Sequence, residues 1–481
     1  MNYRMIINIT AKILCAEAVF MIPAAIISVI YGETGVAGAF ALSMGIILIL
    51  CLPFAMKPSK RTGFYARDGF MTVGIVWLAV SAFGALPTFI SGVIPNCIDA
   101  FFESVSGFSA TGASILSDIN NLPKGILYWR SFSHWLGGMG VLLFLLAMGP
   151  LFNDSGNSAY LMKAEVTGPK VGRLVPRIRG TAKILYGIYL SLTLAQIILL
   201  LIGGTPLFDA VSISFGTAGT GGFPVRGDNM ASYSVFTQNV TAVFMVLCGI
   251  NFNIYYLLIM RETKRILKSD ELKIYFLIIV VSIFIITLNV LHIFGSVGEA
   301  LRHAAFHVAA IISTTGFYTV DYNLWPELSK TMLVFLMVIG SCAGSTGGGV
   351  KISRIIIIAK SARRSIYNAL RPNSVRLMHM DGELVEEDTV NMVHGYVMLY
   401  VIIISITTLI ISIDGFNFET NFTAVLACIN NIGYGFADVG AVENYGNFSG
   451  LSKIVLSFNM LAGRLEIFPI MAIFTPSAWR K

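Results

Sequence analysis

The sequence predicts an all-α membrane protein, and three observations lead to this class. Of 481 residues, 56% are hydrophobic and only 12% are charged, whereas a soluble globular chain has about 25% charged residues. The apolar residues gather in segments long enough to cross a bilayer, which takes about 20 residues each. After two such segments, a unit of span, short apolar stretch and span repeats four times. We therefore expect about ten spans: two extra N-terminal helices, then four span–pore loop–span repeats around one pore.

The long apolar segments are the expected spans. Their approximate bounds are 10–31, 36–56, 70–93, 126–149, 181–203, 233–260, 273–294, 331–359, 391–413 and 451–475. Four shorter apolar stretches are typical of re-entrant segments, and they lie near 97–112, 207–221, 300–316 and 420–433. This plan divides the chain into an N-terminal part with two spans and a basic loop, followed by four repeats. The predicted bounds are 1–69, 70–180, 181–272, 273–390 and 391–481.

The basic residues predict the orientation in the membrane. Lys and Arg gather in four connecting segments and at the termini, while Asp and Glu are frequent in the other connections. Because cytoplasmic loops carry an excess of Lys and Arg, we expect both termini in the cytoplasm and a multi-pass protein of the plasma membrane. The net charge of +7 thus reflects topology and a lipid bilayer as surroundings, and we expect no nucleic-acid partner.

Each short apolar stretch ends in a related tetrapeptide. The four are Ala110-Thr111-Gly112-Ala113, Gly219-Thr220-Gly221-Gly222, Thr314-Thr315-Gly316-Phe317 and Asn431-Ile432-Gly433-Tyr434. Irregular backbone at membrane depth is tolerated only where protein buries it or where it lines a water-filled path. Glycine reaches positive φ without strain and lets the backbone approach an ion closely. Four such loops could therefore share one axis and coordinate a dehydrated cation with their carbonyl oxygens.

The sequence resembles the TrkH family of Trk-type potassium-uptake proteins over essentially its whole length. The matching stretches include Ser109 to Ala113, Trp135 to Gly140, Thr220 to Phe223, Ser313 to Phe317, Gly340 to Gly349 and Gly463 to Glu466. The two extra spans favour the Trk type over the related Ktr type. The resemblance implies that potassium is the transported ion, with no covalently bound cofactor. It also implies that a filter for potassium forms from Ala110, Thr111, Gly112, Gly219, Thr220, Gly221, Thr314, Thr315, Gly316, Asn431, Ile432 and Gly433.

The resemblance further implies partners. A cytosolic nucleotide-binding ring of the TrkA type would dock on basic cytoplasmic segments, and the membrane subunit would form a homodimer. The expected contact segments are Lys163 to Arg179 and Arg354 to Arg376.

A glycine-rich run interrupts the eighth long segment and is a candidate gate. Glycine costs about 1 kcal/mol relative to alanine in a helix interior, so five glycines between 340 and 349 oppose a continuous helix. Close helix packing through small residues is the alternative. The resemblance implies that this loop obstructs the pore below the filter. The gate residues are Gly340, Gly344, Ser345, Thr346, Gly347, Gly348, Gly349 and Arg464.

Two charged residues accompany this loop. Arg464 lies within the final span, where a charge costs at least about 2.5–3.5 kcal/mol. We expect it to point into the pore beside the glycine-rich loop, the alternative being a buried ion pair with another span. Lys351 follows the loop directly, and its interpretation from sequence is a lysine that extends to the membrane interface.

The predicted function is potassium uptake through a gated, channel-like pore. A sodium- or proton-coupled potassium symporter is the alternative, with the broken helix as its moving element. A membrane enzyme would need convergent Ser/His/Asp groups, paired carboxylates or a metal cluster. The sequence shows no such pattern, so we expect no enzymatic activity.

Overall fold

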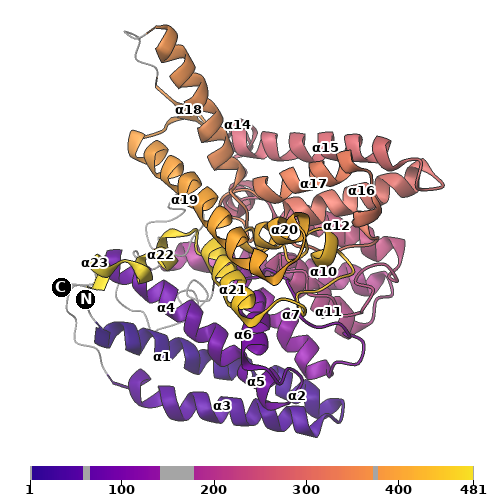
Figure 1. Ribbon diagram of the computed structural model, residues 1–481, viewed down its shortest axis with the longest axis vertical. Coiled ribbons are helices and arrows are strands. Elements are labelled where there is room, and N and C mark those ends of the chain that lie inside the picture. The colour runs from indigo at the N-terminus through magenta and orange to yellow at the C-terminus, as the bar shows by residue number, and fades with distance from the viewer. Residues whose placement is uncertain (1–2, 58–65, 141–177, 372–376, 480–481) are drawn as a thin grey trace.

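The structure is a computed structural model that describes residues 3–57, 66–140, 178–371 and 377–479. These residues are predominantly helical (Figure 1), with a small hairpin formed by β1 (His379–Met380) and β2 (Glu383–Leu384). Some predictions lie outside the described residues. The span predicted at 126–149 is described only to residue 140. Of the contact segment from Lys163 to Arg179, residues 163–177 lie outside the description, as do residues 372–376 of the segment from Arg354 to Arg376.

Six helical segments of the described residues are long and apolar enough to cross a membrane. They are α1 (Tyr3–Phe20) with α2 (Ile22–Ile30), α3 (Thr34–Ala55), α4 (Ala66–Gly84) with α5 (Leu86–Ile90), α10 (Ile178–Ile202), α15 (Asp270–Val290), and α19 (Glu387–Ile411). A seventh span is possible if α12 (Val235–Cys248) and α13 (Phe252–Ile259), which meet at 90°, cross as one. The prediction of an all-α membrane protein is confirmed, while the number of ten spans stays a prediction.

Two further segments are broken: the eighth, which we expected to be interrupted, and the last, which we expected to be continuous. The segment predicted at 331–359 divides into α17 (Glu327–Ile339) and α18 (Ile352–Leu370), and the last one into α21 (Gly450–Arg464) and α22 (Phe468–Phe474). The glycine-rich run causes the first break. At the second, Glu466 and Ile467 have φ of 56° and 66°, values that a helix does not contain. The span predicted at 126–149 begins with α7 (Lys124–Gly138).

All four short apolar stretches form helices of 12 to 16 residues. They are α6 (Cys97–Phe108), α11 (Leu207–Gly219), α16 (Val297–Ile312) and α20 (Phe418–Ile429). The remaining short elements are α14 (Thr263–Lys268), α23 (Pro476–Trp479), and the 3-10 turns η2 (Tyr322–Leu324), η3 (Ser412–Asp414) and η4 (Ala437–Val439).

One order of helix contacts recurs around the four short helices. Each packs between the helix before it and the helix after it: α6 between α4 and α7, α11 between α10 and α12, α16 between α15 and α17, and α20 between α19 and α21. The second helix of each group also contacts the short helix of the next group. These contacts are α7 with α11, α12 with α16, α17 with α20, and α21 with α6, which closes a ring. The exact boundaries that we assigned to the repeats stay predictions.

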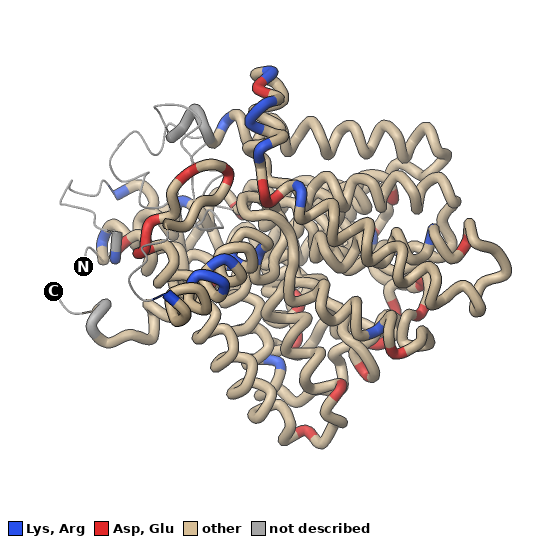
Figure 2. Tube along the Cα trace, turned by 90° about the horizontal axis from the view of Figure 1, so that it is seen from above, with Lys and Arg blue, Asp and Glu red and all other residues tan. Residues whose placement is uncertain are grey.

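The outer surface is suited to lipid. On α3, α15 and α19, the side chains of Ile49, Phe284 and Leu409 are 76%, 63% and 73% exposed. Figure 2 shows long stretches of helix without a charged residue, with Lys, Arg, Asp and Glu gathered mainly near chain reversals. In Figure 1, α1 and α3 lie at one edge, α15 lies at the opposite edge, and α18 projects beyond the bundle. The apolar exterior therefore surrounds a ring of short helices whose ends meet inside.

Candidate functional site

The four short helices end in the same way. At each C-terminus one residue is left-handed, with φ between 54° and 59°. Its N–H donates to the carbonyl three positions earlier, and the following N–H donates to the carbonyl five positions earlier at 2.8–2.9 Å. These two bonds form a Schellman motif, which pairs carbonyls that a helix end leaves free. The left-handed residues are Ala110, Thr220, Thr314 and Asn431.

A glycine with positive φ follows two positions later in each loop. The glycines are Gly112, Gly222, Gly316 and Gly433, with φ of 84°, 69°, 80° and 91°. Other residues adopt this conformation only at a cost, so the backbone itself selects glycine here. Each loop therefore consists of a left-handed residue, a middle residue and a glycine.

This geometry shifts the second loop by one residue relative to the sequence alignment. We aligned Gly219-Thr220-Gly221 with the other loops, because Thr-Gly was the shared pair. In the structure Gly219 is the last residue of α11, and Thr220 is the left-handed residue. The equivalent loop is thus Thr220-Gly221-Gly222, and Gly219 belongs to the helix.

The four loops touch one another in a closed cycle. A Cβ atom added at any of the four glycines would fall inside van der Waals contact with the backbone of the next loop. The contacts are Gly112 with the Gly221 carbonyl, Gly222 with the Thr315 carbonyl, Gly316 with the Ile432 carbonyl, and Gly433 with the Thr111 carbonyl. The loops therefore surround one common axis, as the repeat predicted.

The carbonyl oxygens at these four junctions are buried, and no described residue donates a hydrogen bond to them. Among the hydrogen bonds of the described residues, none ends on the carbonyl of Thr111, Gly221, Thr315 or Ile432. The threonines and Ile432 are 0% exposed. More than 90–95% of buried backbone polar groups in proteins have a partner, so four such carbonyls in one ring require an explanation. Oxygen ligands of this kind suit a hard cation.

The loop side chains bond to the surrounding protein. Thr111 and Thr315 share hydrogen bonds of 2.7 and 2.8 Å with the serine two positions earlier in each loop. The Asn431 amide donates to Thr111 Oγ1 and to the Met460 carbonyl, each at 2.9 Å. The C-terminal ends of the four short helices also meet at the ring, and such ends carry a partial negative charge. Fixed side chains and converging helix ends both favour a cation at the axis.

The glycine-rich loop lies directly against this ring. The Gly348 N–H donates to Thr314 Oγ1 at 2.6 Å. A Cβ on Gly347 would lie 2.6 Å from the Ser313 carbonyl oxygen, and one on Gly348 would collide with the Asn430 carbonyl. Only residues without a side chain fit so closely beneath the third and fourth loops. Of the predicted gate glycines, Gly340, Gly344 and Gly349 have positive φ and shape the turns.

Arg464 joins the glycine-rich loop to two other elements. It is the last residue of α21, it is 8% exposed, and its guanidinium donates to the Thr346 carbonyl at 2.7 Å and to the Gly137 carbonyl at 2.5 Å. It also donates to the Gly138 carbonyl. The last two acceptors are at the C-terminus of α7, where the partial negative charge of a helix end attracts a cation. The structure thus places Arg464 beside the loop, as expected.

The interpretation of Lys351 as an interface lysine is wrong. Lys351 is 1% exposed, and its ammonium donates to the Gly347 carbonyl inside the loop. Its backbone has φ of 78°, which turns the side chain inward instead of along α18. Lys351 is therefore part of the loop structure.

Sequence reasoning missed the contacts that three charged residues make near this loop. Glu271, on α15, accepts hydrogen bonds from Ala343 of the loop and from Ser353 of α18. Arg354, which we expected at the start of a partner-contact segment, is instead 5% exposed and forms an ion pair with Glu466 after α21. Their partners lie 72 to 112 positions away along the chain, so spacing carries no signal for them. An acid just before an apolar segment was the sign in the sequence for Glu271.

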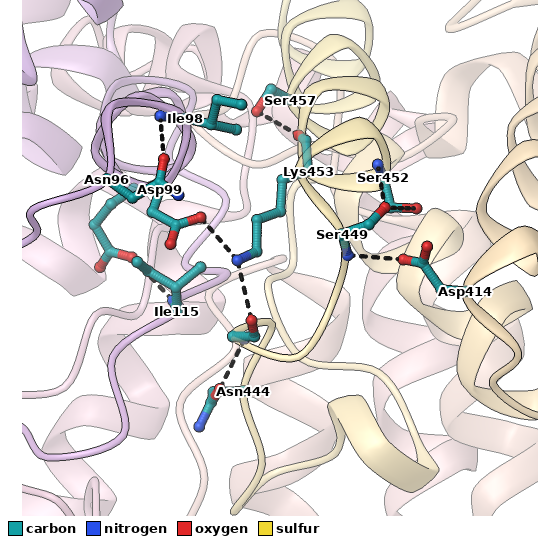
Figure 3. A network of polar contacts seen from close by, with 12 residues as sticks. Asn96, Ile98, Asp99, Ile115, Asp414, Asn444, Ser449, Ser452, Lys453 and Ser457 are labelled. Atoms are coloured by element: carbon teal, nitrogen blue, oxygen red, sulfur yellow. Dashed lines mark hydrogen bonds and ion pairs between the residues drawn. The ribbon is translucent and has the colours of Figure 1, made fainter.

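A second polar network supports the opposite end of α21. The Lys453 ammonium lies 2.7 Å from Asp99 Oδ1 and 3.0 Å from the Gly446 carbonyl oxygen (Figure 3). Ser449, which caps α21, donates its N–H to Asp414 at 2.9 Å. This network joins the fourth group of helices to α6 in the first, at the point where the ring closes.

Comparison with known proteins agrees with this architecture. Residues 39–481 match the TrkH family, described as cation transport proteins. The Trk system potassium uptake protein TrkH of Vibrio parahaemolyticus is 33% identical over 492 residues and that of Salmonella typhimurium 32% over 489, with 100% of both chains covered in each case. The Escherichia coli protein TrkG is 29% identical over 488 residues, covering 100% of this chain and 99% of its own.

A solved structure shows the same fold. The crystal structure of the potassium transporter TrkH from Vibrio parahaemolyticus superposes with a TM-score of 0.88 at 31% identity and covers 100% of both chains. The resemblance drawn from the motifs is therefore confirmed.

Proposed function

Since the chain belongs to the TrkH family of cation transport proteins, we propose that it takes up potassium through a gated, channel-like pore. The ring of four loop backbones is the filter, and potassium is cargo and not a resident cofactor. The relatives that the chain matches over their full length are named potassium uptake proteins. In the register of the structure, the filter consists of residues 110–112, 220–222, 314–316 and 431–433.

One observation carries the proposal: four buried carbonyls at the junctions of the loops receive no hydrogen bond from any residue that the structure describes. A potassium ion at the axis would accept their lone pairs and replace the missing hydrogen bonds. Rings of backbone carbonyls substitute for the hydration shell in potassium-selective filters. Because the carbonyls do the binding, Ala110 or Ile432 can stand where another loop has threonine.

The glycine-rich loop and Arg464 form the proposed gate. The loop is within hydrogen-bonding distance of the filter at Thr314, and Arg464 ties it to α7. A cation leaving the ring on this side would meet the loop backbone and a guanidinium. Conduction therefore requires that the loop move.

Other parts of the proposal follow from charge and family. We place both termini in the cytoplasm of a plasma-membrane protein, with a homodimer as the assembly. A cytosolic nucleotide-binding ring of the TrkA type would control the gate through the basic cytoplasmic segments. The projecting α18 carries Lys360, Arg363 and Arg364, which suits such a contact.

The experiment is ion flux into liposomes containing purified wild-type protein or the Gly316→Ser variant. A side chain at Gly316 would collide with the Ile432 carbonyl and open the ring. We therefore expect the preference for potassium and rubidium over sodium to fall at least about tenfold. This corresponds to the cost of about 1–3 kcal/mol when a buried polar group loses its partner. Gly222→Ser should behave alike. Gly204→Ser is the matched control, because Gly204 also has positive φ, 80°, yet nothing lies within 4 Å of its Cβ position.

Identical ion preference in wild type and Gly316→Ser would refute the filter assignment. The same liposomes test the symporter alternative, since channel-like flux follows the potassium gradient alone. Potassium flux that stops without a sodium or proton gradient would favour the symporter.

A further inference from the structure

We propose that the first turn of α15 is a latch that holds the glycine-rich loop in place, with Glu271 as its positioning residue. Asp270 in the same turn connects this latch to the β1–β2 hairpin and to α18. The inference rests on the proposed function in one respect, namely that the loop obstructs the ion path.

Glu271 connects the glycine-rich loop to the first turn of α18 with one oxygen. Its Oε1 accepts the N–H of Ala343 at 2.7 Å and the N–H of Ser353 at 3.1 Å. Glu271 is 6% exposed, so these charge-assisted bonds form away from water and are stronger than neutral ones. The segment between the two N–H groups contains every loop residue that touches the filter. Releasing Glu271 therefore removes one fixed point on each side of that segment, while Arg464, Lys351 and Thr314 keep their contacts inside it.

Asp270 ties the same turn to the projecting elements. Its carboxylate pairs with the Lys360 ammonium of α18 at 2.8 Å, and its N–H donates to Asp381 Oδ1 at 2.7 Å. Lys360 also donates to the His379 carbonyl at 2.9 Å. The hairpin, α18 and the start of α15 thus form one connected unit. A displacement of the hairpin would therefore move Asp270, the residue directly before Glu271.

The two acids differ in burial, and this difference assigns their roles. The side chains of Lys360 and Asp270 are 39% and 36% exposed, so water and a docking partner can compete for their contacts at small cost. Glu271 is enclosed. The exposed Asp270–Lys360 contact can therefore be replaced by a docking partner, while the buried Glu271 contacts stay intact. A connection from the protein surface to a gate requires this combination.

A simpler reading is that acids at a helix N-terminus favour the helix dipole. That reading accounts for Asp270 and Glu271 as residue types. It does not account for the direction of the Glu271 carboxylate, which bonds to N–H groups of another segment, while Ser269 caps α15 itself. The contacts to the loop therefore point to a positioning role.

The test uses two readouts on full-length protein in liposomes. The first is rubidium flux. The second is the rate at which a charged methanethiosulfonate modifies Cys342, a buried loop residue next to Ala343, in a background where the other five cysteines are replaced. We expect Glu271→Ala to raise both rates at least about tenfold, because two hydrogen bonds to a charged group are lost. Glu271→Gln keeps an acceptor oxygen and should give a smaller rise.

Two further variants define the outer part of the latch. Asp270→Asn should raise both rates about two- to fivefold, since exposed ion pairs contribute little. Glu262→Gln is the matched control: it breaks an exposed pair with Arg265 in the neighbouring α14 and should change neither rate.

The outcomes separate this inference from the proposed function. Unchanged Cys342 reactivity in folded Glu271→Ala and Glu271→Gln proteins would overturn the latch, whatever the flux of other gate variants. Faster Cys342 modification with unchanged flux would support the latch and refute the loop as an obstruction. Thermal unfolding and size-exclusion profiles identify any variant that has not folded.

Discussion

Replacing Arg464 with alanine removes the guanidinium that joins the glycine-rich loop to α7 and α21. The side chain donates to three carbonyls, one on the loop at Thr346 and two at the end of α7. Alanine leaves the Thr346 carbonyl without this partner and also removes a positive charge from the proposed ion path. Both changes favour a displaced loop, so we expect basal cation flux to rise.

The magnitude follows from the bond to Thr346. A hydrogen bond to a charged group contributes about 1.5–3 kcal/mol net, which corresponds to a factor of roughly 10 to 150 in the ratio of closed to open loop. The bonds to α7 hold the guanidinium in position but do not touch the loop, so they do not enter this ratio. If the loop obstructs most of the time, flux should rise by a similar factor.

The assay is rubidium uptake into liposomes at a fixed potassium gradient, without any cytosolic partner. Arg464→Lys is the matched control, because it keeps the charge and loses the planar fork that reaches carbonyls on two elements. An intermediate rise in Arg464→Lys would show that the tie to the loop matters beyond charge. Wild-type or lower flux in a correctly folded Arg464→Ala protein would refute the reasoning.

Two other variants test neighbouring contacts, beside those already described for Gly316 and Glu271. Thr314→Val removes the hydroxyl that accepts the Gly348 N–H and keeps the side-chain shape; flux should rise roughly fivefold for a loss of about 1 kcal/mol, and an unchanged flux would contradict a loop held by the filter. Lys453→Met leaves Asp99 without its ammonium. Breaking a fully buried ion pair costs about 3–5 kcal/mol of stability. Because the Asp99 side chain is 21% exposed, we expect the free energy of unfolding to fall by about 1–3 kcal/mol. The measurement is the unfolding temperature in detergent, which should be lower. The double variant Asp99→Asn with Lys453→Met should recover part of this loss, and no recovery would count against a specific pair.

Composition and local pattern were sufficient for the membrane class and for the four short helices. Each is apolar, too short to span, and followed by glycine, so its position follows from residues that are neighbours in sequence. For the first, third and fourth loops, the pattern also gave the correct glycine. These features depend on local sequence, which is why they could be predicted.

The second loop needed the tertiary structure. Thr220-Gly221-Gly222 contains two adjacent glycines, and both fit the pattern. Only the left-handed end of α11 at Thr220, and the contact of Gly222 with the third loop, decide between them. The physical reason is that glycine permits positive φ but does not require it, so the neighbouring loop makes the choice.

Partners of the buried charges were likewise beyond the sequence. Arg464 bonds to carbonyls 118 and 327 positions away, and Glu271 to N–H groups 72 and 82 positions away. A charge inside an apolar segment indicates that a partner must exist, because burying an unpaired charge is too costly. Which partner the charge finds depends on how the four groups of helices close into a ring. The partners here are backbone N–H and carbonyl groups, and since every residue has them, the sequence does not indicate which ones will bond.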